Sequence, residues 1–168
     1  QPWTLLTVVL AHGSMFHIFA NMVTFYFFGT PTERLIGSKR LLKFYIGSAL
    51  VASIGYVVFR NLLFYAYGPV TNGLPALSPA VGASGAVVAT FAVVAMLYPQ
   101  AEVLLYFFIP MKIKTALYIF AGLEGVNMLA KTFGIYLPLI GGFASSAHLA
   151  GMIVGIWYGR RLQDRYAR

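Results

Sequence analysis

Five apolar stretches separated by short polar segments constrain the fold of this chain more than any other feature. Hydrophobic residues make up 60% of the 168 residues and charged residues only 10%, whereas a typical soluble domain is about 25% charged. Long uncharged apolar runs are typical of helices that cross a lipid bilayer. We therefore predict an all-α membrane protein, a polytopic transmembrane helical bundle. Its spans are expected at residues 16–30, 41–65, 84–98, 113–129 and 143–158.

The basic residues indicate how such a bundle is oriented. With five alternating spans, ten of the twelve Lys and Arg residues fall on one side of the membrane, and only Arg60 and Lys131 fall on the other. Cytoplasmic loops are enriched in Lys and Arg, so we expect a cytoplasmic C-terminus. The net charge of +8 does not indicate nucleic-acid binding, because the basic residues lie between apolar stretches and not on one polar face. The expected surroundings are the lipid bilayer.

Chain length and residue types limit the remaining possibilities. The 168 residues predict a single domain over residues 1–168. The chain has no Cys, which excludes disulfides and thiolate metal sites. Three histidines, His12, His17 and His148, would be enough for a catalytic zinc. However, the spacing of His12 and His17 does not align two ligands on one helix face, so we predict neither a metal nor a cofactor.

The third apolar stretch is short, and it begins with a serine. Residues 84–98 would give roughly 22 Å of helix against a hydrocarbon core of about 30 Å. If the stretch ends at the interface near Pro99, Ser84 begins a helix inside the membrane. The preceding Gly- and Pro-rich residues 68–79 cannot form a regular helix. Irregular backbone at this depth requires burial by protein or access by water, so we expect a water-filled pocket around Ser84.

Ser84 and His148 are a candidate nucleophile and base. Ser84 lies between Gly82 and Gly85, and His148 lies in an equally small-residue segment that includes Gly151. Small residues let membrane helices approach closely, and histidine can accept the proton of a serine hydroxyl. The alternative is that the glycines only pack and that Ser84 bonds to a helix carbonyl.

No carboxylate is expected to complete a triad with Ser84 and His148. Glu33, Glu102 and Asp164 fall on the basic side of the predicted bundle. Glu124 falls within the fourth span, where we expect a structural role, although an intramembrane carboxylate is a functional candidate by default. We therefore predict a Ser–His dyad.

A second polar group precedes and opens the first span. His17 and Asn21 are four residues apart and so share one helix face. Their side-chain donors, with the Ser84 backbone N–H, are suited to stabilising an oxyanion. The alternative for His17 and Asn21 is a polar clamp between helices. His12 lies before the span and is expected to bond to a loop carbonyl.

Together these residues resemble the rhomboid family of intramembrane serine proteases. The matching elements occur in the family's order: His12-x4-His17-x3-Asn21, Glu33-x3-Gly37, Gly82-x-Ser84-Gly85 and Ala147-His148-x2-Gly151-x3-Gly155. The resemblance covers nearly the whole chain. It implies a helical bundle whose active site opens to the extracytoplasmic side of a membrane, which we expect to be a prokaryotic cell membrane.

The resemblance also implies a mechanism and a substrate class. Ser84 would be the nucleophile that forms an acyl-enzyme, His148 the base, and His17 and Asn21 the oxyanion-stabilising residues. His12, Gly82, Gly85 and Gly151 would support the site. Substrates of the family are the transmembrane helices of other membrane proteins.

Two departures from the family pattern are expected to matter. The usual first core helix precedes the His-rich segment, and this sequence begins too close to His12 to contain it, so we expect it to be absent from these 168 residues, either encoded upstream and lost or truly missing. An aromatic residue often follows the nucleophile by four positions and packs on the catalytic histidine, but here that residue is Val88. The alternatives to a protease are a catalytically silent rhomboid-like protein that binds transmembrane clients, and a transporter or channel.

Overall fold

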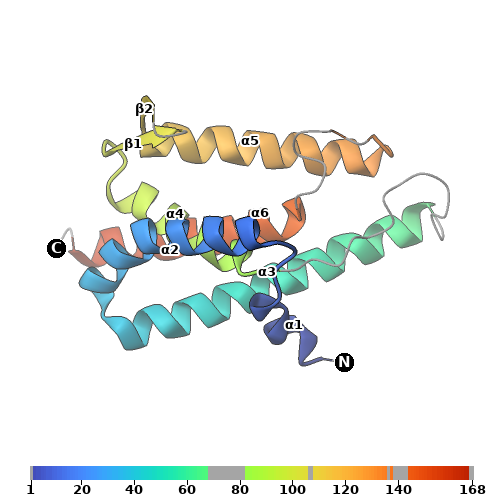
Figure 1. Ribbon diagram of the computed structural model, residues 1–168, viewed down its shortest axis with the longest axis horizontal. Helices are drawn as coiled ribbons and strands as arrows, with labels where there is room; N and C mark the ends of the chain where they lie inside the picture. The colour runs from blue at the N-terminus through green and yellow to red at the C-terminus, as the bar shows by residue number, and fades with distance from the viewer. Residues whose placement is uncertain (1, 68–81, 106–107, 136, 138–143, 167–168) are drawn as a thin grey trace.

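The computed structural model describes residues 2–67, 82–105, 108–135, 137 and 144–166, and its architecture is almost entirely helical (Figure 1). A short helix α1 (Thr4–Thr7) and a 3-10 turn η1 (Val8–Leu10) precede α2 (Met15–Ile36) and α3 (Ser38–Tyr67). The chain continues with α4 (Ser84–Leu97), strands β1 (Glu102–Leu105) and β2 (Ile109–Lys112), α5 (Ile113–Thr132) and α6 (Ser145–Tyr166). The predicted all-α bundle is confirmed, and the predicted irregular segment 68–79 lies outside the described residues, as does the expected start of the fifth span at residue 143.

The short helix α4 forms the centre of the bundle. It packs most extensively against α6, and it also contacts α2, α3 and α5. In Figure 1 the long helix α3 runs below the centre, α5 lies above it and α2 crosses the front. Ten of the fourteen residues of α4 are buried, so this helix has little surface left for lipid or water.

Glycines in α6 allow α4 and α6 to pack backbone against backbone. A Cβ added at Gly151 would collide with the carbonyl oxygen of Gly85, and one added at Gly155 would collide with the carbonyl oxygen of Ala89. Gly85 in turn lies against the side chain of Ala52 on α3. Small faces of this kind allow close helix approach, and the predicted contact between the two small-residue helices is confirmed.

Helix α2 extends past the predicted end at residue 30. It begins after Ser14, whose hydroxyl caps the helix by accepting the His17 N–H at 3.1 Å, and it continues through Pro31 to Ile36. Proline removes one backbone donor, but Thr32 and Ile36 beyond it are buried. This burial outweighs the proline penalty, and the helix ends at Gly37, where the positive φ of 82° favours glycine.

The hairpin between α4 and α5 was not predicted. Strands β1 and β2 pair antiparallel, with Glu102 opposite Lys112 and Leu105 opposite Ile109. Each strand is only four residues long. Over so few residues, the alternation of apolar and polar side chains that marks a strand cannot be distinguished from the pattern of an apolar loop.

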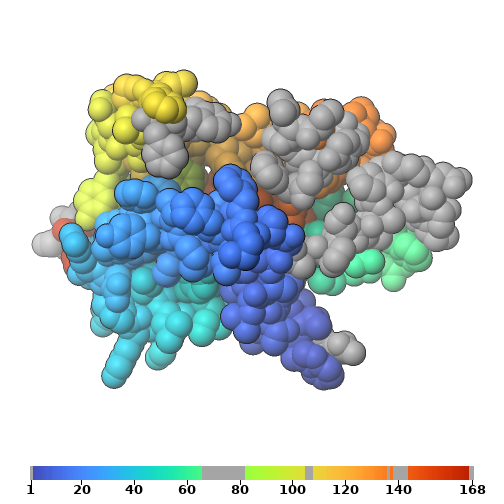
Figure 2. Space-filling model, in the orientation of Figure 1, coloured from blue at the N-terminus to red at the C-terminus, as the bar shows by residue number. Residues whose placement is uncertain are grey.

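The outer surface of α2 is apolar, as expected for a helix that faces lipid. Phe16 is 78% exposed, and Phe19, Tyr26 and Phe27 are each more than half exposed. Figure 2 shows α2 lying across the visible face of the molecule. Exposed rings along one helix are costly in water, so this surface is better suited to a bilayer.

Only part of the predicted span count follows from helix length and composition. Among the described residues, Ser38–Tyr65 is long and apolar enough to cross a membrane. A second span results if the segments Thr4–Leu10 and Met15–Ile36, which are bent by 94°, are taken as one, and Ser84–Leu97 is a shorter apolar helix. The count of five spans remains a prediction.

Candidate functional site

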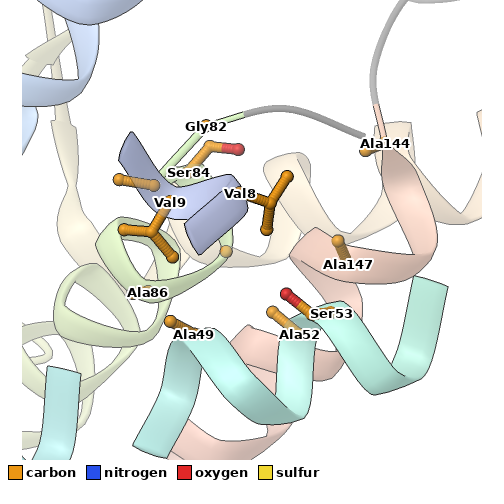
Figure 3. A pocket seen from close by; sticks show the side chains of 12 residues that line it. Val8, Val9, Ala49, Ala52, Ser53, Gly82, Ser84, Ala86, Ala144 and Ala147 are labelled. Atoms are coloured by element: carbon orange, nitrogen blue, oxygen red, sulfur yellow. The ribbon is translucent and has the colours of Figure 1, made fainter. Parts of the chain in front are cut away.

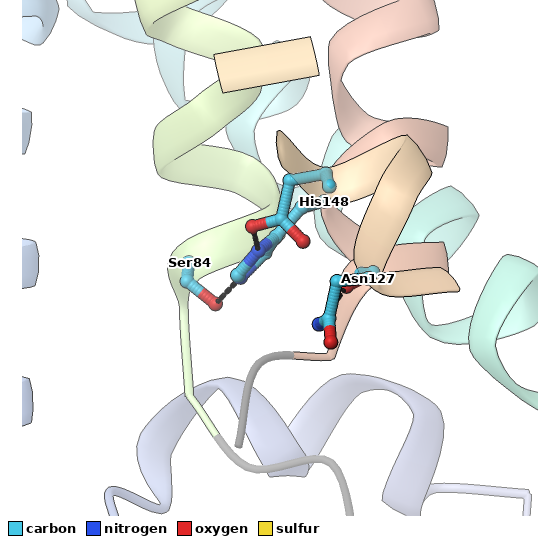
Figure 4. Close-up of polar contacts among 5 residues, drawn as sticks. Ser84, Asn127 and His148 are labelled. Carbon is cyan, nitrogen blue, oxygen red and sulfur yellow. Dashed lines mark hydrogen bonds and ion pairs between the residues drawn. The ribbon is translucent and has the colours of Figure 1, made fainter. Parts of the chain in front are cut away.

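The predicted nucleophile and base meet in the centre of the bundle. Ser84 is the first residue of α4 and His148 lies in the first turn of α6. Nε2 of His148 is 2.7 Å from Oγ of Ser84, a hydrogen bond between residues 64 positions apart (Figure 4). The contact between Gly85, directly after Ser84, and Gly151, three residues after His148, brings the two helix starts this close.

A carboxylate on α5 also contacts His148. Oε1 of Glu124 lies 2.7 Å from Nδ1 of His148, the ring nitrogen that does not face Ser84. The Glu124 side chain is 1% exposed and that of His148 is 11% exposed. The prediction that no carboxylate is placed to extend the Ser84–His148 pair is therefore wrong.

Helical periodicity explains why Glu124 reaches His148. Phe120, Glu124 and Asn127 follow the spacing i, i+4 and i+7, which places them on one face of α5. All three contact the start of α6: Asn127 Nδ2 donates to Ser145 Oγ at 2.6 Å, and the Phe120 ring lies 5.9 Å from the His148 ring. This periodicity was readable in the sequence, but which helix the polar face meets was not.

Phe120 also changes the expectation for Val88. The sequence lacks an aromatic residue four positions after Ser84, which predicted a loosely held His148. Val88 is instead a buried member of a hydrophobic cluster with Met152 and Leu117. Among the described residues, Phe120 on α5 supplies an aromatic contact to the histidine, and both ring nitrogens of His148 are hydrogen-bonded.

Residues from α2 border the other side of Ser84. Gly82 has a φ of 111°, and a Cβ added there would lie 2.9 Å from Nε2 of His17 and 3.6 Å from Nδ2 of Asn21. Asn21 is 5% exposed, and its Nδ2 has no hydrogen-bond partner among the described residues. The segment before Ser84 thus lies against an imidazole edge and an unused amide donor.

His12 contacts His17, and the η1 turn contacts Gly82 at the start of this segment. Nδ1 of His12 lies 3.4 Å from the carbonyl oxygen of Leu10, a backbone carbonyl outside the long helices, as predicted. The rings of His12 and His17 meet edge to face at 5.2 Å. The N–H of Gly82 donates to the carbonyl of Val8 at 3.1 Å, which ties the start of α4 to the N-terminal turn.

A small pocket adjoins Ser84 (Figure 3). Its walls come from η1, α3, the start of α4 and the start of α6, and nearly all of its lining side chains are small. They are Val8, Val9, Ala49, Ala52, Ser53, Gly82, Ala83, Ser84, Gly85, Ala86, Ala144 and Ala147. In the described part of the chain, no group of three or more His, Cys, Asp or Glu side chains is arranged to hold a metal ion.

The fold and this site define a helical membrane-type bundle in which a partly buried serine is hydrogen-bonded to a buried histidine between the helices. The chain matches the family model described as Rhomboid domain over residues 1–165. It belongs to the rhomboid family, whose members are integral membrane proteins.

Several curated relatives share this domain. The chain is 36% identical over 155 residues to RHOMBOID-like protein 12, mitochondrial, of Arabidopsis thaliana. The matched region covers 90% of this chain and 44% of that protein. It is 29% identical over 154 residues to Rhomboid protein 1, mitochondrial, of Saccharomyces cerevisiae, covering 89% of this chain and 38% of the relative. It is 31% identical over 161 residues to Rhomboid protease GlpG of Haemophilus influenzae, covering 95% of this chain and 69% of that protein.

These comparisons also show how much of its relatives the chain spans and in which compartment those relatives are named. The chain spans less than half the length of the two mitochondrial relatives. Because these relatives are mitochondrial by name, they conflict with the expectation of a prokaryotic cell membrane.

Proposed function

We propose that this chain is an intramembrane serine protease that hydrolyses peptide bonds in or near the transmembrane helices of other proteins. The observation that carries the proposal is the 2.7 Å hydrogen bond between Ser84 Oγ and His148 Nε2, which is partly buried within a rhomboid-family bundle. A hydroxyl becomes an effective nucleophile when an adjacent base accepts its proton.

The proposed reaction proceeds through an acyl-enzyme. Ser84 Oγ attacks the scissile carbonyl carbon while its proton moves to Nε2 of His148. The C–N bond then breaks and His148 returns the proton to the leaving amine. Water then attacks the carbonyl carbon of the resulting ester and gives a proton to His148. The ester bond to Ser84 breaks, and His148 passes that proton to Ser84 Oγ. Each step uses the same pair of atoms, which the packing of α4 on α6 holds in contact.

We assign the oxyanion that forms during attack to donors beside Ser84. The Ser84 N–H lies in the first turn of α4, where backbone donors have no partner within the helix and negative charge is favoured. The unused Nδ2 of Asn21 and the His17 ring lie next to Gly82. Preorganised donors of this kind supply a large part of catalysis in acyl-transfer enzymes.

The proposal also covers the activity of the whole chain and its orientation in the membrane. The relative named a protease is 31% identical to this chain, which supports proteolysis as the activity of residues 1–168 acting as one catalytic domain. We place the site on the membrane side opposite the basic loops and the C-terminus on the basic side.

A fluorescent fluorophosphonate tests the activated serine directly. Detergent-solubilised wild type should label, and Ser84→Ala and His148→Ala should both abolish labelling while circular dichroism shows an unchanged helix content. Unlabelled wild type that passes this test would then be assayed for cleavage of transmembrane substrates. If folded wild type does not label, the alternative of a catalytically silent protein that binds transmembrane clients is favoured.

A further inference from the structure

We propose that Glu124 is a positioning residue that holds His148 in the tautomer with its proton on Nδ1, so that the site works as a Ser–His–Glu triad. This inference rests on the proposed function, since it describes how the same base is prepared. The observation behind it is the 2.7 Å contact between Glu124 Oε1 and His148 Nδ1, made by a side chain with 1% of its surface exposed.

Burial makes this contact more than a chance ion pair. A carboxylate removed from water is destabilised by several kcal/mol unless it is paired and hydrogen-bonded. Asn127, one turn later on the same face, is committed to Ser145 at 2.6 Å. The hydrogen-bond partner of Glu124 in this polar group is therefore the His148 ring.

The hydrogen-bond geometry selects one tautomer. A carboxylate oxygen can only accept, so a bond to Oε1 requires a proton on Nδ1. Nε2 of the neutral ring then carries a lone pair, and this atom is the one 2.7 Å from the Ser84 hydroxyl. His148 is thereby prepared to accept the serine proton, and the carboxylate stabilises the imidazolium that results.

Other described groups approach His148 or its surroundings from several elements. Ser84 faces it from α4 and Phe120 from α5. His17 on α2 interacts with His148 electrostatically, and Lys131 on α5 interacts in the same way with Glu124. From α3, the pocket beside Ser84 receives Ala52 and Ser53, neither of which is ionisable near neutral pH.

Glu124→Gln tests the proposal because it keeps the shape and removes the charge. A glutamine amide can donate to Nδ1, which moves the ring proton to Nε2 and blocks the base. The equivalent amide substitution in a serine protease triad lowers kcat about 10⁴-fold. We expect the rate of fluorophosphonate labelling to fall at least about 100-fold, and Glu124→Asp to label at least about tenfold faster than Glu124→Gln.

Nitrogen-15 NMR of the histidine rings gives a readout that a purely structural role would not change. The chain has only three histidines, so His148 can be assigned by comparison with His148→Ala. We expect wild type to carry the proton on Nδ1 and Glu124→Gln to carry it on Nε2. Asn127→Ala is the matched control: it removes a buried polar contact on the same face, lowers thermal stability and leaves the His148 tautomer unchanged.

The possible results separate this inference from the proposed function. If wild type labels and Glu124→Gln labels within about threefold of it, the triad is overturned and the protease stands. If wild type does not label, the protease fails, and the wild-type tautomer still decides the role of Glu124. If Glu124→Gln does not fold, a wild-type proton on Nε2 overturns the proposal, and a proton on Nδ1 together with active Glu124→Asp supports it.

Discussion

Asn21 is a single buried residue whose amide donor is not used by the described part of the chain. Its Nδ2 lacks a hydrogen-bond partner among the described residues although the residue is 5% exposed. An unsatisfied buried donor costs about 1–3 kcal/mol, a cost that is understandable if the donor is needed by a reaction intermediate. Its position beside Gly82 makes the oxyanion of an acyl-transfer reaction the group that would satisfy it.

Asn21→Ala should therefore lower activity without lowering stability. Loss of one oxyanion donor reduces kcat by about 10²–10³, and we expect a similar loss in the rate of fluorophosphonate labelling. No hydrogen bond to Nδ2 from the described residues is broken, so the thermal unfolding midpoint should be kept. Asn61→Ala, which removes an exposed amide that donates to the Val57 carbonyl on α3, is the control. A labelling rate for Asn21→Ala equal to that of Asn61→Ala would contradict the assignment.

Residue types and spacing predicted some parts of this site and missed others. Ser84 and His148 were found because each is polar in a small-residue, apolar setting where a helix gains nothing from polarity. Glu124 and Phe120 were not assigned to His148, because helical spacing shows that they share a face but not which helix that face meets. That information depends on the packing of α5 against α6, which is a tertiary property.

At the scale of elements, the contact between α4 and α6 determines whether the two site residues meet. Gly151, three residues after His148, lies against the backbone of Gly85, which directly follows Ser84. A methyl group added at this position meets a backbone carbonyl, which cannot rotate away. The helices would have to separate, and the hydrogen bond between Ser84 and His148 would lengthen with them.

Gly151→Ala should therefore destabilise the bundle and inactivate it. Overpacking of a well-packed interior costs about 1–3 kcal/mol, which should appear as a lower midpoint of thermal unfolding in detergent together with reduced fluorophosphonate labelling. Gly122→Ala on α5 is the control, since an added Cβ there meets nothing within 4 Å and alanine favours the helix by about 1 kcal/mol over glycine. Equal midpoints for the two variants would show that α4 and α6 are not in backbone contact.

Element boundaries were less predictable than element positions. The first span was expected to end at residue 30, but buried Thr32 and Ile36 carry α2 through Pro31 to residue 36. The Glu102–Lys112 hairpin was missed because its strands are too short to show a period. In both cases tertiary packing decides a choice that local sequence leaves open.

At the scale of the whole molecule, the distribution of charge predicts both the number of crossings and the orientation. Lys39 and Arg165 belong to the group of ten basic residues assigned to one side, and Arg60 belongs to the other. Because the chain has no Cys, the variants Lys39→Cys, Arg60→Cys and Arg165→Cys each carry one exposed thiol without background. In sealed right-side-out vesicles, a membrane-impermeant maleimide should label only Arg60→Cys, since Lys- and Arg-rich loops stay cytoplasmic; detergent should make all three reactive. Labelling of Lys39→Cys and Arg165→Cys from opposite sides would mean an odd number of crossings between them, and the five-span topology would be wrong.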